Sequence, residues 1–459
     1  MHGWLPWLIQ AIAVIVLIAA VGWRTARWRR LWLPVAIAAG VALTAAVHWY
    51  VGTEGLAGDP APKLLWIWIT ATGAAVVVFI AGWRSAHWWR RGAAALALPL
   101  TVLCSALALN LWVGYFPTMQ TAWNQLTAGP LPDQTDQATV IALQKARRIP
   151  SKGSVLTVDI ASAASGFKHR GEVVYLPPAW YASAPPPHLP TIMMIGGEFN
   201  TPADWLRAGN AITTVDAFAA SHGGNAPVLV FIDSGGAFNN DTECVNGSRG
   251  NAADHLTKDV PPFMESTYGV SANPANWGIV GWSMGGTCAV DLAVMHPDLF
   301  SAFEDIAGDA APNSGNQQQT IERLFGGSGA AYASFDPTTV MNRHGAYNGV
   351  AGWFDVNGTP QVTTAKANPN GGNGLGGRDA AGHTSDQLTA ANSLCATGST
   401  HGIACEVVSQ PGKHDWPFAA HAFAVALPWL SSQLGTPGVP SVSLPAPAPP
   451  PNTQDVAAK

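Results

Sequence analysis

Charged residues are scarce in this sequence. Only 11% of the 459 residues are Asp, Glu, Lys or Arg, while apolar residues make up 48%. An average globular protein has about 25% charged residues. A chain with so little charge and so much apolar surface is not intrinsically disordered. The composition favours membrane-spanning segments joined to a folded domain.

The few charges are unevenly divided along the chain. Residues 1–118 hold 8 of the 23 Lys and Arg and 2 of the 28 Asp and Glu, so this part carries +6 and the remainder carries −11. A domain with a charge of −11 repels a phosphate backbone, so we expect no nucleic-acid partner. Twelve of the 20 Trp residues also lie in the first 118 residues, which is typical of side chains at a membrane–water interface.

No charge interrupts four apolar stretches at 5–23, 31–51, 64–83 and 93–116. Each has roughly 19–24 residues, enough to cross ~30 Å of hydrocarbon as a helix. Since no ionisable side chain lies in the middle of a span, a proton or ion path is disfavoured. We interpret residues 1–118 as a membrane domain of four transmembrane helices. A cleaved signal peptide at the first stretch is the alternative, disfavoured because no Lys or Arg precedes it.

Two arginine clusters predict the orientation of these helices. They lie at 24–30 and 84–91, whereas the loop between the second and third stretches carries Glu54 and Asp59 against one Lys. The positive-inside rule places both clusters in the cytoplasm. The chain is therefore predicted to be a multi-pass protein of the cell membrane, with everything after residue 116 extracytoplasmic.

The remaining sequence predicts a linker, a catalytic domain and a tail. Residues 119–150 are polar and are interpreted as a linker or stalk, and the Pro- and Ala-rich segment 436–459 is expected to be disordered. In 151–435, apolar β-branched runs alternate with helical patterns, which predicts an α/β domain with a mostly parallel sheet flanked by helices. The expected strands are 154–160, 172–177, 190–195, 227–233, 276–282, 349–356 and 403–409, and the expected helices are near 205–221, 252–267, 284–296, 385–396 and 417–434.

Four of the five cysteines lie in the predicted outer domain, and the fifth, Cys104, lies in an apolar stretch. An even number outside the membrane favours two disulfides in an oxidising compartment. Cys395 and Cys405 bracket a short loop and are paired here, which leaves Cys244 for Cys288. No Cys or His spacing indicates a zinc site, and we expect neither a metal nor another cofactor.

The strongest catalytic motif is Gly-x-Ser-x-Gly, formed by Gly281, Ser283 and Gly285. An apolar strand runs into it and a helical pattern runs out of it, which predicts the sharp turn of a nucleophile elbow with Ser283 as the nucleophile. His414 follows the last apolar run and matches the Ser…acid…His order of α/β-hydrolases, so it is the predicted base.

The oxyanion that forms during acyl transfer needs two backbone N–H donors. One is expected from Met284, directly after the nucleophile. The other is expected from the loop after the strand at 190–195, which reads Gly-Gly-Glu-Phe-Asn. We choose the N–H of Glu198 within this loop, with that of Gly197 as the alternative.

With these motifs, residues 151–434 resemble the esterase D and mycolyltransferase group of α/β-hydrolases, which includes the secreted mycolyltransferase antigens of actinobacteria. The shared features are the Gly-x-Ser-Met-x-Gly elbow, Asn-Gly-Thr-Pro at 357–360 after a strand, and His-Asp-Trp at 414–416 in place of the family's His-Ser-Trp. The resemblance implies ester hydrolysis or acyl transfer through an acyl-serine, on lipid, glycolipid or small ester substrates of the cell envelope. The four membrane stretches lie outside it.

The acid of the triad is the least determined residue. Asp379, Asp355 and Asp386 are the candidates after the nucleophile. Asp379 is preferred because the acid of the resembled family follows a loop behind the Asn-Gly-Thr-Pro segment. The sequence therefore predicts a membrane-anchored extracytoplasmic serine esterase or acyltransferase with Ser283, Asp379 and His414. A catalytically silent binding or scaffolding protein of the cell envelope is the alternative.

Overall fold

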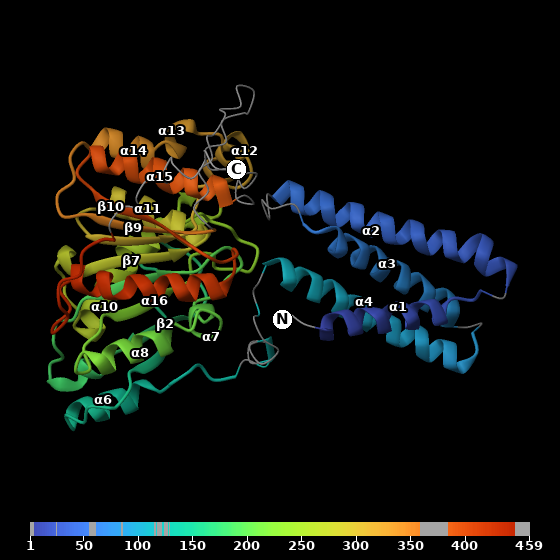
Figure 1. Ribbon diagram of the computed structural model, residues 1–459, viewed down its shortest axis with the longest axis horizontal. Coiled ribbons are helices and arrows are strands. Elements are labelled where there is room, and N and C mark those ends of the chain that lie inside the picture. Colours follow the sequence, from blue (N-terminus) through green and yellow to red (C-terminus); the bar gives the residue numbers. More distant parts are fainter. Residues whose placement is uncertain are drawn as a thin grey trace, which may run out of the picture. The chain divides into compact units, whose positions relative to one another are not determined.

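The computed structural model of the chain describes residues 4–23, 25–54, 61–83, 86–113, 116, 122–123, 127, 129–358 and 384–445. The chain divides into two compact units, Met1–Trp123 and Asn124–Lys459 (Figure 1). The first unit is helical, and the second unit contains a β-sheet whose strands alternate with helices.

The helices of the first unit are α1 (Trp4–Ala20), the π-helical turn η1 (Trp28–Trp32), α2 (Leu33–Glu54), α3 (Lys63–Trp83) and α4 (Trp88–Val113). Three apolar segments among the described residues are long enough to cross a membrane: Trp28–Val51, Lys63–Trp83 and Trp88–Leu111. Four spans were predicted, and the fourth apolar helix of this unit, α1, is shorter than these three segments, with 17 described residues. It ends where Gly22 lies against the Trp28 ring, so closely that an added Cβ would meet Trp28 Cδ1 at 2.4 Å.

Small residues and a few polar pairs hold these helices together. A Cβ added to Gly73 of α3 would lie 2.8 Å from the Cα of Gly40 in α2, so the two backbones touch there. Trp68 Nε1 donates to Gln10 Oε1 at 3.2 Å, and the hydroxyls of Thr44 and Thr70 are 2.7 Å apart. Close backbone contact and interhelical hydrogen bonds are how helices associate where the surroundings are as apolar as their side chains.

The second unit is built on an eight-stranded sheet in the order β1-β2-β4-β3-β7-β8-β9-β10. Strands β1, β2 and β4 pair antiparallel, and all pairs from β4 to β10 are parallel. Two short strands form a separate hairpin. The bounds are β1 (Ser154–Val158), β2 (Glu172–Leu176), β3 (Thr191–Ile195), β4 (Val228–Ile232), β5 (Asn246–Gly247), β6 (Gly250–Asn251), β7 (Trp277–Trp282), β8 (Ala302–Ile306), β9 (Ala351–Asn357) and β10 (Ala404–Gln410).

Helices cover both faces of this sheet (Figure 1). The described helices of this unit are α6 (Gln137–Lys145), η2 (Pro178–Ala182), α7 (Asp204–Arg207), α8 (Ala211–Ser221), α9 (Ala252–Asp254), η3 (His255–Asp259), α10 (Val260–Tyr268), η4 (Pro274–Asn276), α11 (Met284–Met295), α12 (Gln317–Phe325), α13 (Gly329–Tyr332), α14 (Pro337–His344), α15 (Thr384–Thr400) and α16 (Trp416–Gln433).

The side chains of β9 point alternately to the two faces of the sheet, and their contacts show which helix covers which face. Trp353 of β9 packs on Trp429 of α16 with ring centroids 5.7 Å apart, whereas its neighbour Phe354 packs on Phe303 of β8. Successive side chains of a strand point to opposite faces, so α16 covers one face. Phe303 and Phe354 share the other with buried residues of α11 such as Cys288. The elbow helix and α16 therefore lie on opposite sides of the sheet.

The prediction of an α/β domain is confirmed, but it missed one strand of the large sheet, β8. All seven expected strands are present, but β8 was not expected because its sequence Ala-Phe-Glu-Asp-Ile carries two acids. Glu304 and Asp305 are nevertheless at most 2% exposed. Helices α12, α13 and α14 were also not predicted, since this stretch is polar and lacks a long apolar stripe.

The predicted linker at 119–150 contains part of the second unit. Asp136 caps α6, since its side chain accepts a hydrogen bond from the N–H of Thr139. Val140 on this helix is fully buried in the same core as Leu156 and Val174. At the other end, the N–H of Val442 donates to Ser432 Oγ, so the first residues of the predicted tail fold back onto α16. Residues 446–459 lie outside the described part of the chain.

Val140→Ala is expected to lower the free energy of unfolding of the second unit by roughly 1–3 kcal/mol, because it removes buried methyl groups from a closed core. Chemical denaturation of the purified chain measures the change. Ile141→Ala, at a neighbouring position with 38% exposure, is the matched control and should change stability little. Equal effects of the two changes would contradict the packing of α6 on this core.

Candidate active site

Ser283 stands at a sharp turn between β7 and α11. Its backbone has φ 57° and ψ −122°, a conformation rarely adopted by residues other than glycine. Two hydrogen bonds fix it: the Ser283 N–H donates to the carbonyl of Ile306 at 2.9 Å, and the N–H of Gly286 donates to the Ser283 carbonyl at 2.7 Å. The turn presents the serine at the N-terminus of a 12-residue helix, as the elbow motif predicts.

The flanking glycines are required by close backbone contacts. A Cβ on Gly281 would lie 1.6 Å from the carbonyl oxygen of Gly285, and one on Gly285 would lie 2.5 Å from that of Ile195. No side chain fits in either place without moving the chain. The two glycines of the motif are therefore required by the close packing of β3, β7 and α11 around Ser283.

His414 reaches Ser283 from the loop between β10 and α16. Its Nε2 is 2.9 Å from Ser283 Oγ, across 131 residues of sequence. The loop is short because Asp415 already caps α16, accepting a hydrogen bond from the N–H of Phe418. The His-Asp-Trp motif thus combines the histidine, a helix cap and the first helical residue.

Aromatic side chains cover part of the ring of His414, which is half-buried. Trp282 lies against it with ring centroids 4.3 Å apart, and Trp282 also contacts Trp416 and Phe418. Burial lowers the pKa of His414 to about 4. The imidazole is therefore neutral at pH 7, the state required of a base that accepts a proton from a serine.

The other ring nitrogen of His414 contacts a residue that sequence reasoning missed. Nδ1 lies 3.1 Å from Nε2 of Gln387 in α15, and the same Nε2 donates to the carbonyl of Ala307 at 3.1 Å. Gln387 is 3% exposed. Glutamine carries no ionisable group, so a search for a triad acid passes over it.

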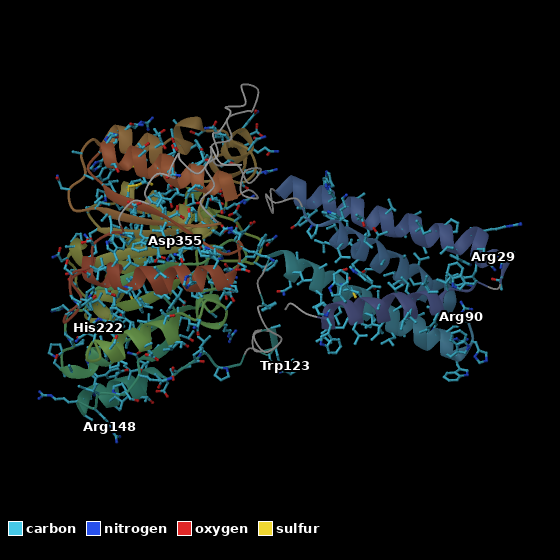
Figure 2. All side chains as sticks on the ribbon, viewed as in Figure 1. Arg29, Arg90, Trp123, Arg148, His222 and Asp355 are labelled. Carbon is cyan, nitrogen blue, oxygen red and sulfur yellow. A yellow bond between two sulfur atoms is a disulfide. The ribbon has the colours of Figure 1, made fainter. Side chains whose placement is uncertain are left out.

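Of the three candidates for the triad acid, the structure describes the side chain of Asp355 only. Asp355 is fully buried within the sheet (Figure 2), where its Oδ1 accepts a hydrogen bond from Gln410. Burial raises its pKa to about 7, so it is a poor fixed anion. No hydrogen bond among the described residues joins Asp355 to His414. Asp379 lies outside the described residues, as does the side chain of Asp386, so Asp379 as the acid stays a prediction.

The predicted oxyanion loop lies against the nucleophile. A Cβ on Gly197 would be 3.1 Å from the Cβ of Ser283. The N–H of Gly197 itself donates to Asn200 Oδ1 at 2.8 Å, so in this structure it is not the second oxyanion donor. Glu198 lies in this loop and Met284 opens α11, and their N–H groups stay the predicted donors.

Arg170 anchors that loop from a distance. Its Nη2 donates to the Asn200 carbonyl at 2.8 Å and to Asp233 Oδ1 at 2.6 Å. Burial opposes the charge of Asp233, but its hydrogen bonds with Arg170 hold its pKa below the usual value. Arg170 thereby fixes the turn that carries Glu198. The residue has no motif around it that could have identified it from sequence.

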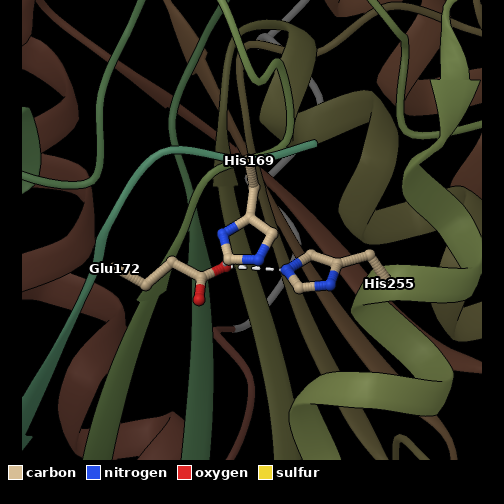
Figure 3. Close-up of side chains that lie close together, drawn as sticks. All are labelled: His169, Glu172 and His255. Atoms are coloured by element: carbon tan, nitrogen blue, oxygen red, sulfur yellow. Dashed lines mark hydrogen bonds and ion pairs between the residues drawn. The ribbon is translucent and has the colours of Figure 1, made fainter. Parts of the chain in front are cut away.

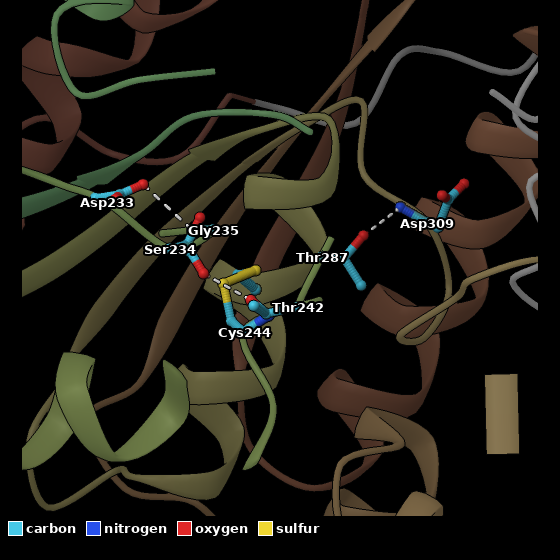
Figure 4. Close-up of a disulfide and its surroundings, with 8 residues drawn as sticks. Asp233, Ser234, Gly235, Thr242, Cys244, Thr287 and Asp309 are labelled. Carbon is cyan, nitrogen blue, oxygen red and sulfur yellow. Dashed lines mark hydrogen bonds between the residues drawn. A yellow bond between two sulfur atoms is a disulfide. The ribbon is translucent and has the colours of Figure 1, made fainter. Parts of the chain in front are cut away.

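Two disulfides are present, with the predicted pairing. Cys244 joins Cys288 of the elbow helix, and Cys395 joins Cys405 between α15 and β10. The first disulfide lies near Thr242, which donates to the Ser234 carbonyl and ties the loop after β4 together (Figure 4). It connects this loop covalently to the helix that carries Ser283 at its N-terminus.

The side chains of His169, Glu172 and His255 lie close enough together to suggest a metal site (Figure 3). Nδ1 of His169 lies 2.8 Å from the carbonyl of Arg170, and Nε2 lies 2.7 Å from that of Ile160. A carbonyl only accepts, so both nitrogens donate and neither has a lone pair for a metal. Burial opposes the charged form, but these carbonyls and Glu172 favour it and raise the pKa of His169. The cluster is an ion-pair network.

Comparison with known proteins identifies the family. A family model described as "Putative esterase" matches residues 168–430, more than half of the chain. The chain belongs to this esterase family. The parallel sheet, the elbow and the helices on both faces are those of an α/β-hydrolase, which confirms the predicted fold and the resemblance to esterases and mycolyltransferases.

Two curated relatives match parts of this chain. An uncharacterised protein of Corynebacterium glutamicum is 33% identical over 211 residues, covering 44% of this chain and 49% of that protein. The MPT51 antigen of Mycobacterium leprae is 29% identical over 144 residues, covering 29% of this chain and 44% of the antigen. The esterase-family chain thus spans about half the length of the curated relatives it matches.

Solved structures also match part of this chain. A ferulic acid esterase matches with 18% identity and a TM-score of 0.46, covering 61% of this chain and 99% of that structure. MPT51 of Mycobacterium tuberculosis matches with 17% identity and a TM-score of 0.41, covering 61% and 97%.

Gly281→Ala is expected to disrupt the elbow, because the new methyl group would collide with the Gly285 carbonyl. The cost should be several kcal/mol of stability, as for other overpacked sites, or failure to fold. Thermal unfolding measures it. Gly329→Ala, where an added Cβ meets nothing within 4 Å, is the matched control and should unfold like the parent chain. A Gly281→Ala chain with parental stability would show that the elbow is looser than described.

Proposed function

We propose that the chain is a membrane-anchored extracytoplasmic serine esterase or acyltransferase that works through an acyl-serine intermediate. The observation that carries this proposal is the 2.9 Å separation of His414 Nε2 and Ser283 Oγ at a strained strand–helix turn. A histidine within hydrogen-bonding distance of a serine at such a turn is the arrangement of nucleophile and base. Membership of the esterase family supports the same chemistry.

The reaction follows from this geometry. Oγ of Ser283 attacks the ester carbonyl carbon while its proton passes to Nε2 of His414. The oxyanion is stabilised by the N–H groups of Met284 and Glu198. As the intermediate collapses, the ester bond breaks and the leaving alcohol takes the proton from Nε2. Water or a sugar hydroxyl then attacks the acyl carbon and loses its proton to Nε2 of His414. The bond to Ser283 Oγ breaks, the acyl group leaves on the attacking oxygen as an acid or an ester, and Oγ takes the proton back from Nε2.

The apolar helices of the first unit favour one class of substrate, lipid or glycolipid esters. Three apolar helices are long enough to span a bilayer, and arginines cluster at 24–30 and 84–91. Under the positive-inside rule the second unit lies outside the cytoplasm, where its two disulfides would persist. A tethered active site encounters lipids at high effective concentration. We therefore propose lipid or glycolipid esters of the cell envelope as substrates, as for a mycolyltransferase.

A catalytically silent binding or scaffolding protein of the envelope is the second candidate. One observation favours it: the described partner of His414 Nδ1 is an amide rather than a carboxylate. In serine hydrolases a carboxylate at this position holds the imidazole and stabilises its cation. Turnover by the purified chain separates the two functions.

Ser283→Ala is expected to lower hydrolysis of a short-chain ester at least about 100-fold, because the nucleophilic oxygen is lost and the triad acts as a unit. The fold should be retained, since only one oxygen is removed. Ester turnover with thermal unfolding as a check measures both. Ser266→Ala, at an exposed serine of α10, is the matched control. Undiminished turnover in Ser283→Ala would exclude Ser283 as the nucleophile.

Protease added to spheroplasts that express the chain is expected to remove the second unit, because the arginine clusters place it outside the cytoplasm. Immunoblotting with an antibody against the C-terminal unit follows its loss. A cytoplasmic marker protein should stay intact until the membrane is permeabilised. Protection of the second unit before permeabilisation would contradict the proposed orientation.

A further inference from the structure

Two phenylalanines form an aromatic pair in two neighbouring loops of the second unit. Phe199 lies in the loop after β3 and Phe238 in the loop after β4, and their ring centroids are 5.2 Å apart. Phe238 is 70% exposed, more than any other large apolar side chain among the described residues of this unit. Phe199 is only half-buried, so packing of the core does not account for the pair. We call Phe199 and Phe238 the aromatic platform.

The platform begins two residues away from a contact with the nucleophile. A Cβ on Gly197 would lie 3.1 Å from the Cβ of Ser283, so this part of the loop touches the elbow. Glu198, whose N–H is a predicted oxyanion donor, directly precedes Phe199. An ester carbonyl that is held by this N–H therefore lies beside the platform.

The backbone at Phe199 is strained and held in place. Its φ is 66°, in the left-handed region that residues other than glycine seldom adopt. The N–H of Asn200 donates to the Gly197 carbonyl at 3.1 Å, and the Asn200 carbonyl accepts from Nη2 of Arg170 at 2.8 Å. Strain of this kind persists only where the surroundings fix it, and it is concentrated at functional sites. The loop thus holds a bulky aromatic side chain where glycine would be less strained.

The same ion pair fixes the loop that carries Phe238. Asp233 accepts hydrogen bonds from Nη2 of Arg170 at 2.6 Å and from the N–H of Gly236 at 3.1 Å. Arg170 and Asp233 therefore position both loops of the platform before a substrate binds. A preformed apolar surface loses less conformational entropy on binding than a surface that has to be ordered first.

The order of the strands indicates which part of the substrate reaches the platform. Strands β4 and β3 lie on one side of β7, and β10 lies on the other side. Ser283, which follows β7, is thus placed between the platform and His414, which follows β10. The alcohol oxygen of the ester takes its proton from Nε2 of His414, so the alcohol has to face this histidine. The acyl chain is left with the opposite side, where the platform lies.

Building on the proposed function, we propose that Phe199 and Phe238 bind the apolar acyl chain of the ester and make the enzyme prefer long acyl chains. The chain lies over both rings, and each methylene group that leaves water strengthens binding. The platform binds substrate and takes no part in bond making. The substrate class is therefore esters with medium or long alkyl chains on the acyl side.

The test measures kcat/KM of the purified full-length chain for p-nitrophenyl esters from acetate to decanoate. The decanoate-to-acetate ratio should exceed one in the parent and fall at least about fivefold in Phe238→Ser, through a higher KM for decanoate. Phe238→Trp keeps an aromatic ring and should hold the ratio within about twofold. Phe199→Gly should also lower the ratio, because glycine adopts φ 66° without strain but has no ring. Ile149→Ser, at a 57% exposed residue outside both loops, is the control and should leave the ratio unchanged.

A second series, from ethyl to decyl acetate, varies the alcohol in place of the acyl chain. Thermal unfolding checks that the variants fold, and replacement of the exposed Phe238 should cost little stability. An unchanged ratio in folded Phe238→Ser and Phe199→Gly, or a parental preference that follows the alcohol chain alone, overturns the platform. If both variants misfold, the two series in the parent chain decide. Turnover without any preference for acyl length overturns the platform only, whereas no turnover of any ester refutes the proposed esterase function itself.

Discussion

The site depends on one strained backbone conformation. Ser283 is held at φ 57° between β7 and α11, and such strain persists only where the surroundings fix it. The glycines on either side leave room for the turn, and Ile306 of the adjacent strand accepts the serine N–H. The disulfide at Cys288 ties the helix behind the serine to the loop after β4. Together these contacts hold the backbone of Ser283 in the conformation that presents its hydroxyl group.

The order of the strands determines the position of the base, His414. The parallel order of β7, β8, β9 and β10 brings the loop after β10 to the same sheet edge as the elbow. His414 needs only a short loop to reach Ser283, because Asp415 starts α16 at once. Between them, the turn after β8 supplies the Ala307 carbonyl that orients Gln387. The nucleophile, its base and the partner of that base are thus fixed by neighbouring strand ends.

The features that depend on local sequence patterns could be predicted from the sequence. The elbow at Ser283, the strand before it and the disulfide pairs follow from spacing and composition. Strand β8 was missed because Glu304 and Asp305 are buried acids, whose burial depends on tertiary packing. Gln387 was missed for a related reason, since its contact with His414 joins residues on separate elements and an amide gives no ionisable signal. The first predicted span, 5–23, extends beyond the end of helix α1 at Ala20, because the apolar run continues past the turn at Gly22.

The central claim is that Ser283 forms an acyl-enzyme. The most direct test is to incubate the purified full-length chain with an activated short-chain ester, quench in acid and locate the adduct by peptide mass spectrometry. The account predicts a mass increase equal to one acyl group on the peptide that contains Ser283, released again on longer incubation with water. No adduct, or an adduct confined to another residue, would contradict it.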